Sequence, residues 1–132
     1  MSIHGFSKSS QKGVVVGGQA SSSIKCFLVG EIDAQMSTSL DYKIYTSGES
    51  PVIVNNDLGS HSDIAGLSSD NIVNRVASSA PGAGGIQLEL SSGLRNDPTA
   101  LADFMDALAT ATDALIDLNL VAEPLVDHCA SL

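Results

Sequence analysis

The sequence has no tryptophan, few aromatic residues and few charged residues, and each scarcity limits what the protein can be. Aromatic residues make up 4% of the 132 residues and charged residues 16%, against about 25% charged residues in typical soluble domains. No apolar run approaches the roughly 20 residues of a membrane-spanning helix. Residues 1–10 contain no apolar signal-peptide segment. We therefore predict one domain, residues 1–132, that does not enter a membrane.

Cysteine is also scarce. Only Cys26 and Cys129 occur, and neither belongs to a Cys-x-x-Cys pair. The two residues either form one disulfide or pack as small buried apolar side chains, and the sequence leaves both open. A small fold built on disulfides is excluded, because such folds are dense in cysteine.

The three histidines form no recognisable metal site. His61 lies between Asp57 and Asp63, a group that has no second nitrogen or sulfur ligand for zinc. His128 precedes Cys129, but no third group completes a nucleophilic arrangement. We predict no bound metal and no cofactor.

Fragments of serine-hydrolase motifs occur without the rest of the motif set. Residues 9–12 and 22–25 match Ser-x-x-Lys and residues 69–71 read Ser-Asp-Asn, as in serine β-lactamases and penicillin-binding proteins. No Lys-Thr-Gly element follows, the chain is too short for that fold, and twenty serines make chance matches common. We therefore predict that the protein is not an enzyme.

Negative charge is concentrated at the end of the chain. The net charge is −9, and residues 97–132 contain seven acidic residues but no basic one. Because Lys and Arg bind phosphate groups, this segment is not expected to contact nucleic acid. Its acidic residues are interpreted as the solvent-exposed face of a helix.

The hydrophobic pattern predicts strands first and helices last. Strands are expected at residues 13–18, 24–34, 41–46 and 86–90, with a loop at 55–70. In the last of these strands, Leu88 and Leu90 alternate with Gln87 and Glu89, which predicts one apolar and one polar face.

The end of the chain changes to a helical period. Asp97 can cap a first turn that opens with Pro98, and the helix is expected to run to about residue 117, with a second short helix from residue 124. The apolar stripe of the first helix is the predicted helix or dimer interface, and it consists of Leu101, Phe104, Met105, Leu108 and Leu115. We predict an α+β fold with a β-rich part (1–96), built on an antiparallel sheet, and C-terminal helices (97–132).

One group of residues suggests a binding surface. Lys25 and Phe27 in one predicted strand have the same parity as Lys43 and Tyr45 in the next. Cations beside aromatic rings on one sheet face can bind single-stranded nucleic acid through charge and base stacking. Lys25, Lys43 and Tyr45 are therefore the candidate nucleic-acid-binding residues, and an ordinary polar outer face is the alternative.

The order of these elements resembles that of the coat proteins of single-stranded RNA bacteriophages. A short N-terminal segment with a polar turn (SIHGFSKSSQKGVVVG) precedes a predicted hairpin (IKCFLVGEIDA, then DYKIYT). More strands follow and end in IQLEL, and SSGLRND leads into the C-terminal helices. The resemblance implies an N-terminal hairpin, an antiparallel sheet and two C-terminal helices. It also implies that two subunits interlock their helices as a homodimer, and that the dimers form a shell around RNA.

The expected function is therefore that of a self-assembling viral coat protein, located in the virion and assembled in the host cytoplasm. Its expected partners are further copies of itself and single-stranded RNA. Two alternatives remain: a structural component of a tailed phage (tail tube, terminator or decoration protein) and a small acidic module that binds another protein. The negative charge favours a tube component, because an acidic lining repels DNA.

Overall fold

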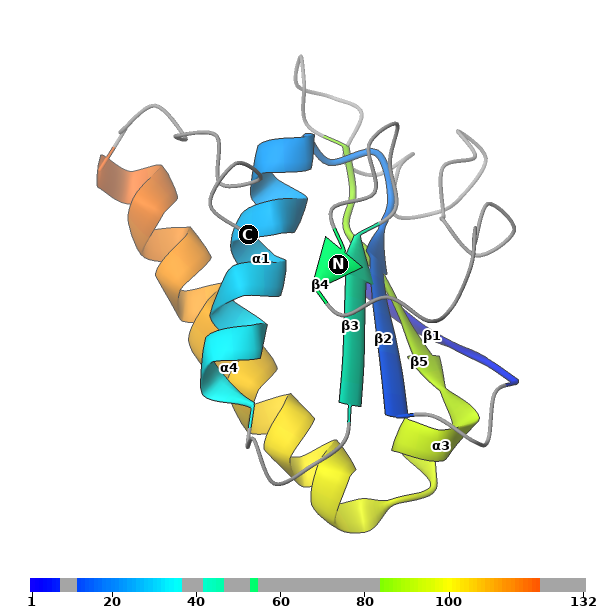
Figure 1. Cartoon of the computed structure of the whole chain (residues 1–132). Coiled ribbons are helices and arrows are strands. Elements are labelled where there is room, and N and C mark those ends of the chain that lie inside the picture. Colours follow the sequence, from blue (N-terminus) through cyan, green and yellow to red (C-terminus); the bar gives the residue numbers. More distant parts are fainter. Residues whose placement is uncertain (8–11, 37–41, 47–52, 55–83, 122–132) are drawn as a thin grey trace.

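The computed structural model describes residues 1–7, 12–36, 42–46, 53–54 and 84–121, and these residues form an α+β fold (Figure 1). The elements in chain order are β1 (Ser2–Phe6), β2 (Lys12–Gly17), α1 (Ser22–Gln35), β3 (Tyr42–Thr46), β4 (Ile53–Val54), β5 (Gln87–Ser91), α3 (Ser92–Arg95) and α4 (Pro98–Val121). Three predicted strands, at 13–18, 41–46 and 86–90, are confirmed as β2, β3 and β5. The long C-terminal helix is also confirmed and runs past its predicted end. No described helix combines the length and apolar character needed to cross a membrane.

The strands form one mixed sheet of five strands in the order β1-β5-β2-β3-β4. β1 pairs with β5, and β2 with β3, in parallel, whereas the β5–β2 and β3–β4 pairs are antiparallel. The predicted antiparallel sheet with an N-terminal hairpin is therefore wrong. β1 and β2 do not pair, because β5 comes from far along the chain and lies between them.

The largest error of the sequence prediction concerns residues 24–34, which belong to helix α1 and not to a strand. Ser21 caps this helix by accepting a hydrogen bond from the backbone N–H of Ile24 at 3.4 Å. Its buried residues run continuously from Lys25 to Val29 and include Ile32. A short apolar run of this kind fits a buried strand or a buried helix equally well. The parallel pairing of β2 and β3 requires a crossover connection, and α1 lies within it.

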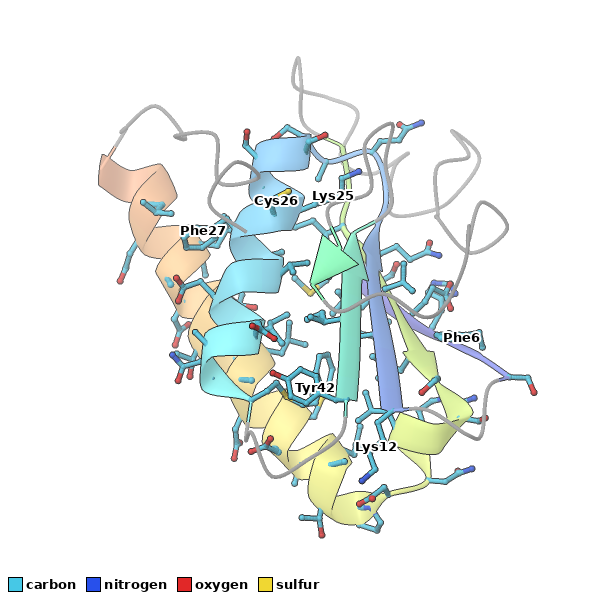
Figure 2. All side chains as sticks on the ribbon, in the orientation of Figure 1. Phe6, Lys12, Lys25, Cys26, Phe27 and Tyr42 are labelled. Carbon is cyan, nitrogen blue, oxygen red and sulfur yellow. The ribbon has the colours of Figure 1, made fainter. Side chains whose placement is uncertain are left out.

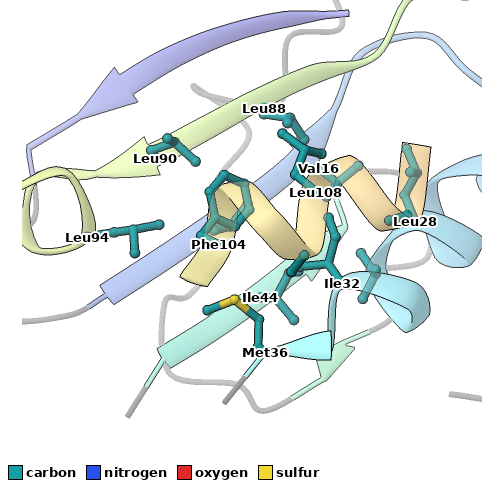
Figure 3. Close-up of a cluster of buried hydrophobic side chains, with 14 of the residues drawn as sticks. Val16, Leu28, Ile32, Met36, Ile44, Leu88, Leu90, Leu94, Phe104 and Leu108 are labelled. Atoms are coloured by element: carbon teal, nitrogen blue, oxygen red, sulfur yellow. The ribbon is translucent and has the colours of Figure 1, made fainter. Parts of the chain in front are cut away.

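Both long helices lie on the same side of the sheet, and the hydrophobic core fills the space between (Figures 1 and 3). The largest core side chains come from β2, β3, β5, α1, α3 and α4, and they include Val14, Val16, Leu28, Ile32, Ile44, Leu88, Leu90, Leu94, Phe104 and Leu108. The predicted alternation of β5 is confirmed, because Leu88 and Leu90 belong to the core while Gln87 and Glu89 have the opposite parity.

Helix α4 begins where the sequence predicted, at a capped first turn. Asp97 Oδ1 accepts hydrogen bonds from the backbone N–H groups of Thr99 (3.1 Å) and Ala100 (3.0 Å). Asp97 Oδ2 lies 2.8 Å from Lys12 Nζ, which is in β2. The Lys12 hydrogen bond, and after it the Ala100 N–H, lowers the pKa of Asp97. One carboxylate therefore joins the start of α4 to the start of β2.

The apolar stripe of α4 is largely covered by this chain's own core. Phe104 and Leu108 belong to the core cluster, and Leu101 and Leu115 pack against it. Met105 is 45% exposed. Packing within one chain thus accounts for four of the five predicted interface residues, and their role in a dimer stays a prediction.

Helix α1 is held by a hydrogen bond from β3 and by a disulfide bond at Cys26. The Tyr42 hydroxyl in β3 donates to Asp33 Oδ1 at 2.9 Å. Burial, then the Asp33 hydrogen bond and the charges of Asp33 and Asp103, raises the pKa of Tyr42. Cys26 is buried and disulfide-bonded, whereas Cys129 lies outside the described residues.

Replacing Phe104 by alanine tests the core assignment of the α4 stripe. Phe104 is fully buried, so Phe104→Ala should lower the free energy of unfolding by about 3–5 kcal/mol. The exposed neighbour provides the control, because Met105→Ala should change it by no more than about 0.5 kcal/mol. Urea unfolding followed by circular dichroism measures both, and equal effects of the two substitutions would contradict the core assignment.

The Tyr42–Asp33 contact predicts a loss of stability at alkaline pH. The Tyr42 hydroxyl has a higher pKa in the folded state than its unfolded-state value of 10.0, so its protonated form stabilises the fold fully below pH 10. This stabilisation is lost as the pH rises from 10 towards the folded-state pKa. Thermal unfolding of the native protein and of Tyr42→Phe, compared from about pH 8 to pH 11, should show the native protein losing its advantage above pH 10. Because the other titrating groups are common to both proteins, a difference that does not change with pH would refute this account.

Candidate active site

The face of the sheet opposite the helices carries polar residues from β1 and β5. The parallel register pairs Ser2 with Gln87 and His4 with Glu89. Neighbouring strands lie about 4.8 Å apart, and paired residues of a parallel ladder project to the same face. Leu88 projects into the core, so residues of the opposite parity face away from α1 and α4. His4 and Glu89 therefore stand side by side on the face that carries neither long helix.

Glu89 is a buried carboxylate with its own hydrogen-bond donor. Only 6% of Glu89 and 4% of Gln87 is exposed, and Gln87 Nε2 donates to Glu89 Oε1 at 2.7 Å. A buried carboxylate without a partner would be strongly destabilising, and this hydrogen bond also fixes the orientation of the carboxyl group. A strand that served packing alone would carry apolar residues here, so the buried polar pair indicates a functional carboxylate.

His4 is exposed, in contrast to Glu89. Figure 2 shows that Phe6, which has the same parity on β1, lies on the side of the sheet away from the helices. The imidazole is thus open to solvent while the neighbouring carboxylate is sheltered. Imidazole and carboxylate groups are the side chains used most often for proton transfer in catalysis, so this pair is the candidate active site.

Arg95 holds the ends of the two site strands together. It follows β5, and its side chain donates from Nε to the Leu90 carbonyl (3.2 Å) and from Nη2 to the Phe6 carbonyl (3.3 Å). A Cβ atom on Gly5 would lie 2.6 Å from Arg95 Nε, so a larger residue at this position would displace the Arg95 side chain from its present place. These contacts fix the β1–β5 register on which the His4–Glu89 pairing depends.

Ser91 connects the same end of β5 to two other elements. Its Oγ accepts a hydrogen bond from the backbone N–H of Gly13 in β2 (2.7 Å) and one from Leu94 (3.2 Å), which caps α3. Ser91 is fully buried. The polar face of β5 is therefore held on one side by β1 and on the other by β2.

A glycine turn lies at the opposite end of β2. Gly18 has a φ of +93°, and a Cβ atom there would collide with the Gly85 carbonyl. The Ala20 N–H donates to the same carbonyl at 3.2 Å, and Lys25 Nζ donates to the Gly18 carbonyl at 3.3 Å. Burial lowers the pKa of Lys25. Lys25 therefore holds the turn that precedes its own helix.

Of the three candidate nucleic-acid-binding residues, Lys25 does not lie in a strand beside the other two. Lys25 belongs to α1 and is only 4% exposed. Lys43 and Tyr45 lie in β3, paired with Gly13 and Val15, but their side chains are outside the described part of the chain. For Lys25 the prediction was wrong because the parity of a strand was applied to a helical segment, in which side chains follow a different period. The role of Lys43 and Tyr45 stays a prediction.

The described residues include no group of three or more His, Cys, Asp or Glu side chains placed to hold a metal ion. His4 and Glu89 are both ligand types for zinc, whose catalytic sites use three protein ligands. The loop group around His61, and His128, lie outside the described residues.

Comparison with known proteins identifies the family. Residues 1–114 match the profile of a family described as poly-gamma-glutamate hydrolase. The chain belongs to this family. A solved bacteriophage poly-gamma-glutamate hydrolase shares the fold, with a TM-score of 0.54 and 20% identity over 88% of this chain and 52% of that one. This chain thus spans about half the length of the solved hydrolase. No curated protein gives a significant match.

Membership in a hydrolase family overturns three predictions. The prediction of an RNA-phage coat protein is wrong, and so is the predicted shell around RNA that followed from it. The prediction that the protein is not an enzyme is also wrong, because the family is one of hydrolases. The alternative of a tail tube, terminator or decoration protein has no support in either match.

Sequence reasoning missed both residues of the candidate site. It placed Gln87 and Glu89 on a polar strand face, but their burial was not visible in the pattern. His4 was not assigned a role, because the strand that the structure pairs with β1 is β5, which lies far along the chain. The available signal was a Gln-x-Glu pair within an otherwise apolar strand.

Proposed function

We propose that this chain contributes to the hydrolysis of poly-γ-glutamate, with His4 and Glu89 as the reacting groups. The observation that carries the proposal is the pairing of these two residues across β1 and β5 in a chain of this family. Because the solved relative is about twice as long as the matched region, the activity of a whole enzyme is part of the proposal.

The substrate defines what the site has to do. Poly-γ-glutamate joins the γ-carboxyl group of one glutamate to the amino group of the next, so the bond to be cleaved is an amide. Each residue keeps a free α-carboxylate, which makes the polymer a polyanion. Cleavage requires activation of a water molecule, stabilisation of the charge that develops on the carbonyl oxygen, and protonation of the leaving nitrogen.

Glu89 is suited to the proton transfers. Its carboxylate accepts a proton from the attacking water while the water oxygen bonds to the amide carbon. The same proton then passes to the nitrogen as the C–N bond breaks, which restores the carboxylate. The Gln87 hydrogen bond occupies one carboxyl oxygen, Oε1, and leaves Oε2 for the water.

His4 is suited to contact the substrate. It is exposed, and it borders the sheltered carboxylate on the same sheet face. An imidazole N–H directed at the scissile carbonyl oxygen stabilises the negative charge that forms there. In this proposal the buried Glu89 transfers the protons, and the exposed His4 stabilises the charge on the carbonyl oxygen.

Substitution of the pair tests the proposal. Glu89→Gln keeps the size of the side chain and its hydrogen bond to Gln87 but removes the base, so kcat/KM for poly-γ-glutamate should fall by about 10²–10⁴-fold. His4→Ala should also reduce kcat/KM. Asp113→Asn, the same carboxyl-to-amide type of change at an exposed position on α4, is the control and should leave activity unchanged.

The assay follows the chain length of the polymer and is run with a chelator and with added Zn²⁺, because imidazole and carboxylate are both zinc ligands. Circular dichroism verifies that each variant folds. Full activity of a folded Glu89→Gln variant would refute the role of the carboxylate.

The charges of protein and substrate predict a salt effect. With a net charge of −9, the chain repels a polyanion, so kcat/KM should rise by about twofold or more between about 0.02 and 0.3 M NaCl as the repulsion is screened. A γ-linked oligomer whose α-carboxyl groups are amidated should show no rise. A fall in kcat/KM with salt would mean that local cations dominate binding.

A further inference from the structure

The donor that holds the Glu89 carboxylate lies on the same strand. Gln87 Nε2 donates to Glu89 Oε1 at 2.7 Å, and only 4% of Gln87 and 6% of Glu89 is exposed. Residues two positions apart on a strand project from the same face about 6.7 Å apart, so the glutamine side chain extends along β5 to reach the carboxylate. The donor and the carboxylate therefore keep a spacing that β5 itself sets.

The neighbours of Gln87 on the adjacent strands are small. In the sheet register, Gln87 pairs with Ser2 of β1 and with Gly17 of β2. Packing between such small neighbours does not require an amide, whereas the buried carboxylate two residues along does require a hydrogen-bond donor. The contact with Glu89 therefore explains a buried glutamine at this position better than packing does.

The charged groups around Glu89 are placed by the register of the described strands. Glu89 pairs with His4 of β1 and with Val15 of β2, so His4 is the titratable group beside it on these strands. Arg95 of α3 contacts Gly5, which directly follows His4 in β1 and therefore belongs to the opposite face. Helices α1 and α4 also lie on that opposite face (Figure 1). The hydrogen bond to the carboxylate thus comes from a neutral amide.

A neutral donor suits a carboxylate that acts as a base. Lys or Arg would also satisfy a buried carboxylate, but a neighbouring cation favours the ionised form and so lowers its affinity for a proton. An amide N–H holds the carboxyl group with a weaker effect on that affinity, because charge-assisted pairs are the stronger ones. With Oε1 held, Oε2 of Glu89 has one defined direction, which proton transfer to and from a bound water requires.

We infer that Gln87 is a positioning residue for the hydrolysis of poly-γ-glutamate. It acts through Glu89 and not on the substrate: its amide N–H directs Oε2 at the attacking water and keeps the buried carboxylate ionised without an adjacent cation. This inference rests on the function proposed above. It adds that the rate of the chemical step depends on a donor at position 87, and not only on a side chain of the right size.

Gln87→Met separates the donor from the size of the side chain. The substitution keeps a long unbranched side chain but donates no hydrogen bond, so kcat should fall by about 10–100-fold, because a reacting group that loses its alignment costs about this much. KM should change by less than about threefold, because the interaction lost acts on the chemical step and not on substrate binding. Steady-state kinetics of the full chain with poly-γ-glutamate measures both constants.

The pH dependence gives a readout that a packing role would not change. In Gln87→Met the buried carboxylate has no donor and takes up a proton more readily, so the ratio of its kcat to the native kcat should fall as the pH is lowered from about 8 to about 5. Gln87→Glu places two carboxyl groups in contact. Such a pair is hydrogen-bonded when it shares one proton and repels when both groups are ionised, so its ratio should rise over the same range.

Tyr42→Phe is the matched control. It also removes a hydrogen bond to a carboxylate, that of Asp33 at 2.9 Å, but at the contact between β3 and α1. Its kcat should equal the native value throughout this pH range, with no trend in the ratio. Circular dichroism verifies that each variant folds.

The outcomes separate this inference from the proposed function. Native kcat in a folded Gln87→Met variant, or ratios for Gln87→Met and Gln87→Glu that do not diverge with pH, would overturn the inference while the native protein still hydrolyses the polymer. No hydrolysis by the folded native protein would overturn the proposed function and the positioning role with it.

Thermal unfolding without substrate tests the contact itself. Because the two carboxyl groups of Gln87→Glu repel when both are ionised, the melting temperature of this variant relative to the native protein should fall as the pH rises from about 5 to about 8. A difference in melting temperature that stays constant over this range would show that the two side chains are not in contact, and would overturn the inference.

Discussion

The pleat of β5 is the constraint on which the core and the candidate site both depend. Successive residues of a strand point to opposite faces, so Leu88 and Leu90 enter the core while Gln87 and Glu89 occupy the other face. A shift of one residue in the pairing of β5 would exchange the two sets and place a carboxylate among apolar side chains. The burial that stabilises the sheet therefore also determines where the candidate catalytic carboxylate, Glu89, lies.

The segment that follows β5 keeps this register in place. Ser91 bonds to β2, Arg95 bonds to the end of β1, and Asp97 caps α4 while contacting Lys12. Within a few residues the chain thus contacts both neighbours of β5 and starts the helix that covers the core. The Ser91 contact is made to a backbone N–H of β2, and the Arg95 contact to a backbone carbonyl of β1. The Arg95 contact keeps β1 aligned with β5, so that His4 stays beside Glu89.

The sequence was sufficient for the elements whose signals are local. The alternation of β5, the β-branched run of β2 and the cap at Asp97 were each read correctly from a few consecutive residues. It was insufficient for residues 24–34, because a short apolar run fits a buried helix and a buried strand alike. Because residues 24–34 were assigned to a strand, a hairpin was predicted that the fold does not contain. The resemblance to coat proteins depended on that hairpin. An order of elements is shared by unrelated proteins, so it is weak evidence for function.

What the sequence by itself determined was local: the start of α4, the two faces of β5, and the negative charge of the C-terminal segment. Only the tertiary structure decided that β5 lies between β1 and β2, and that His4 therefore meets Glu89. The reason is physical. Caps and periodicity depend on neighbours along the chain, whereas strand pairing over long separations is selected by how much apolar surface the whole chain buries.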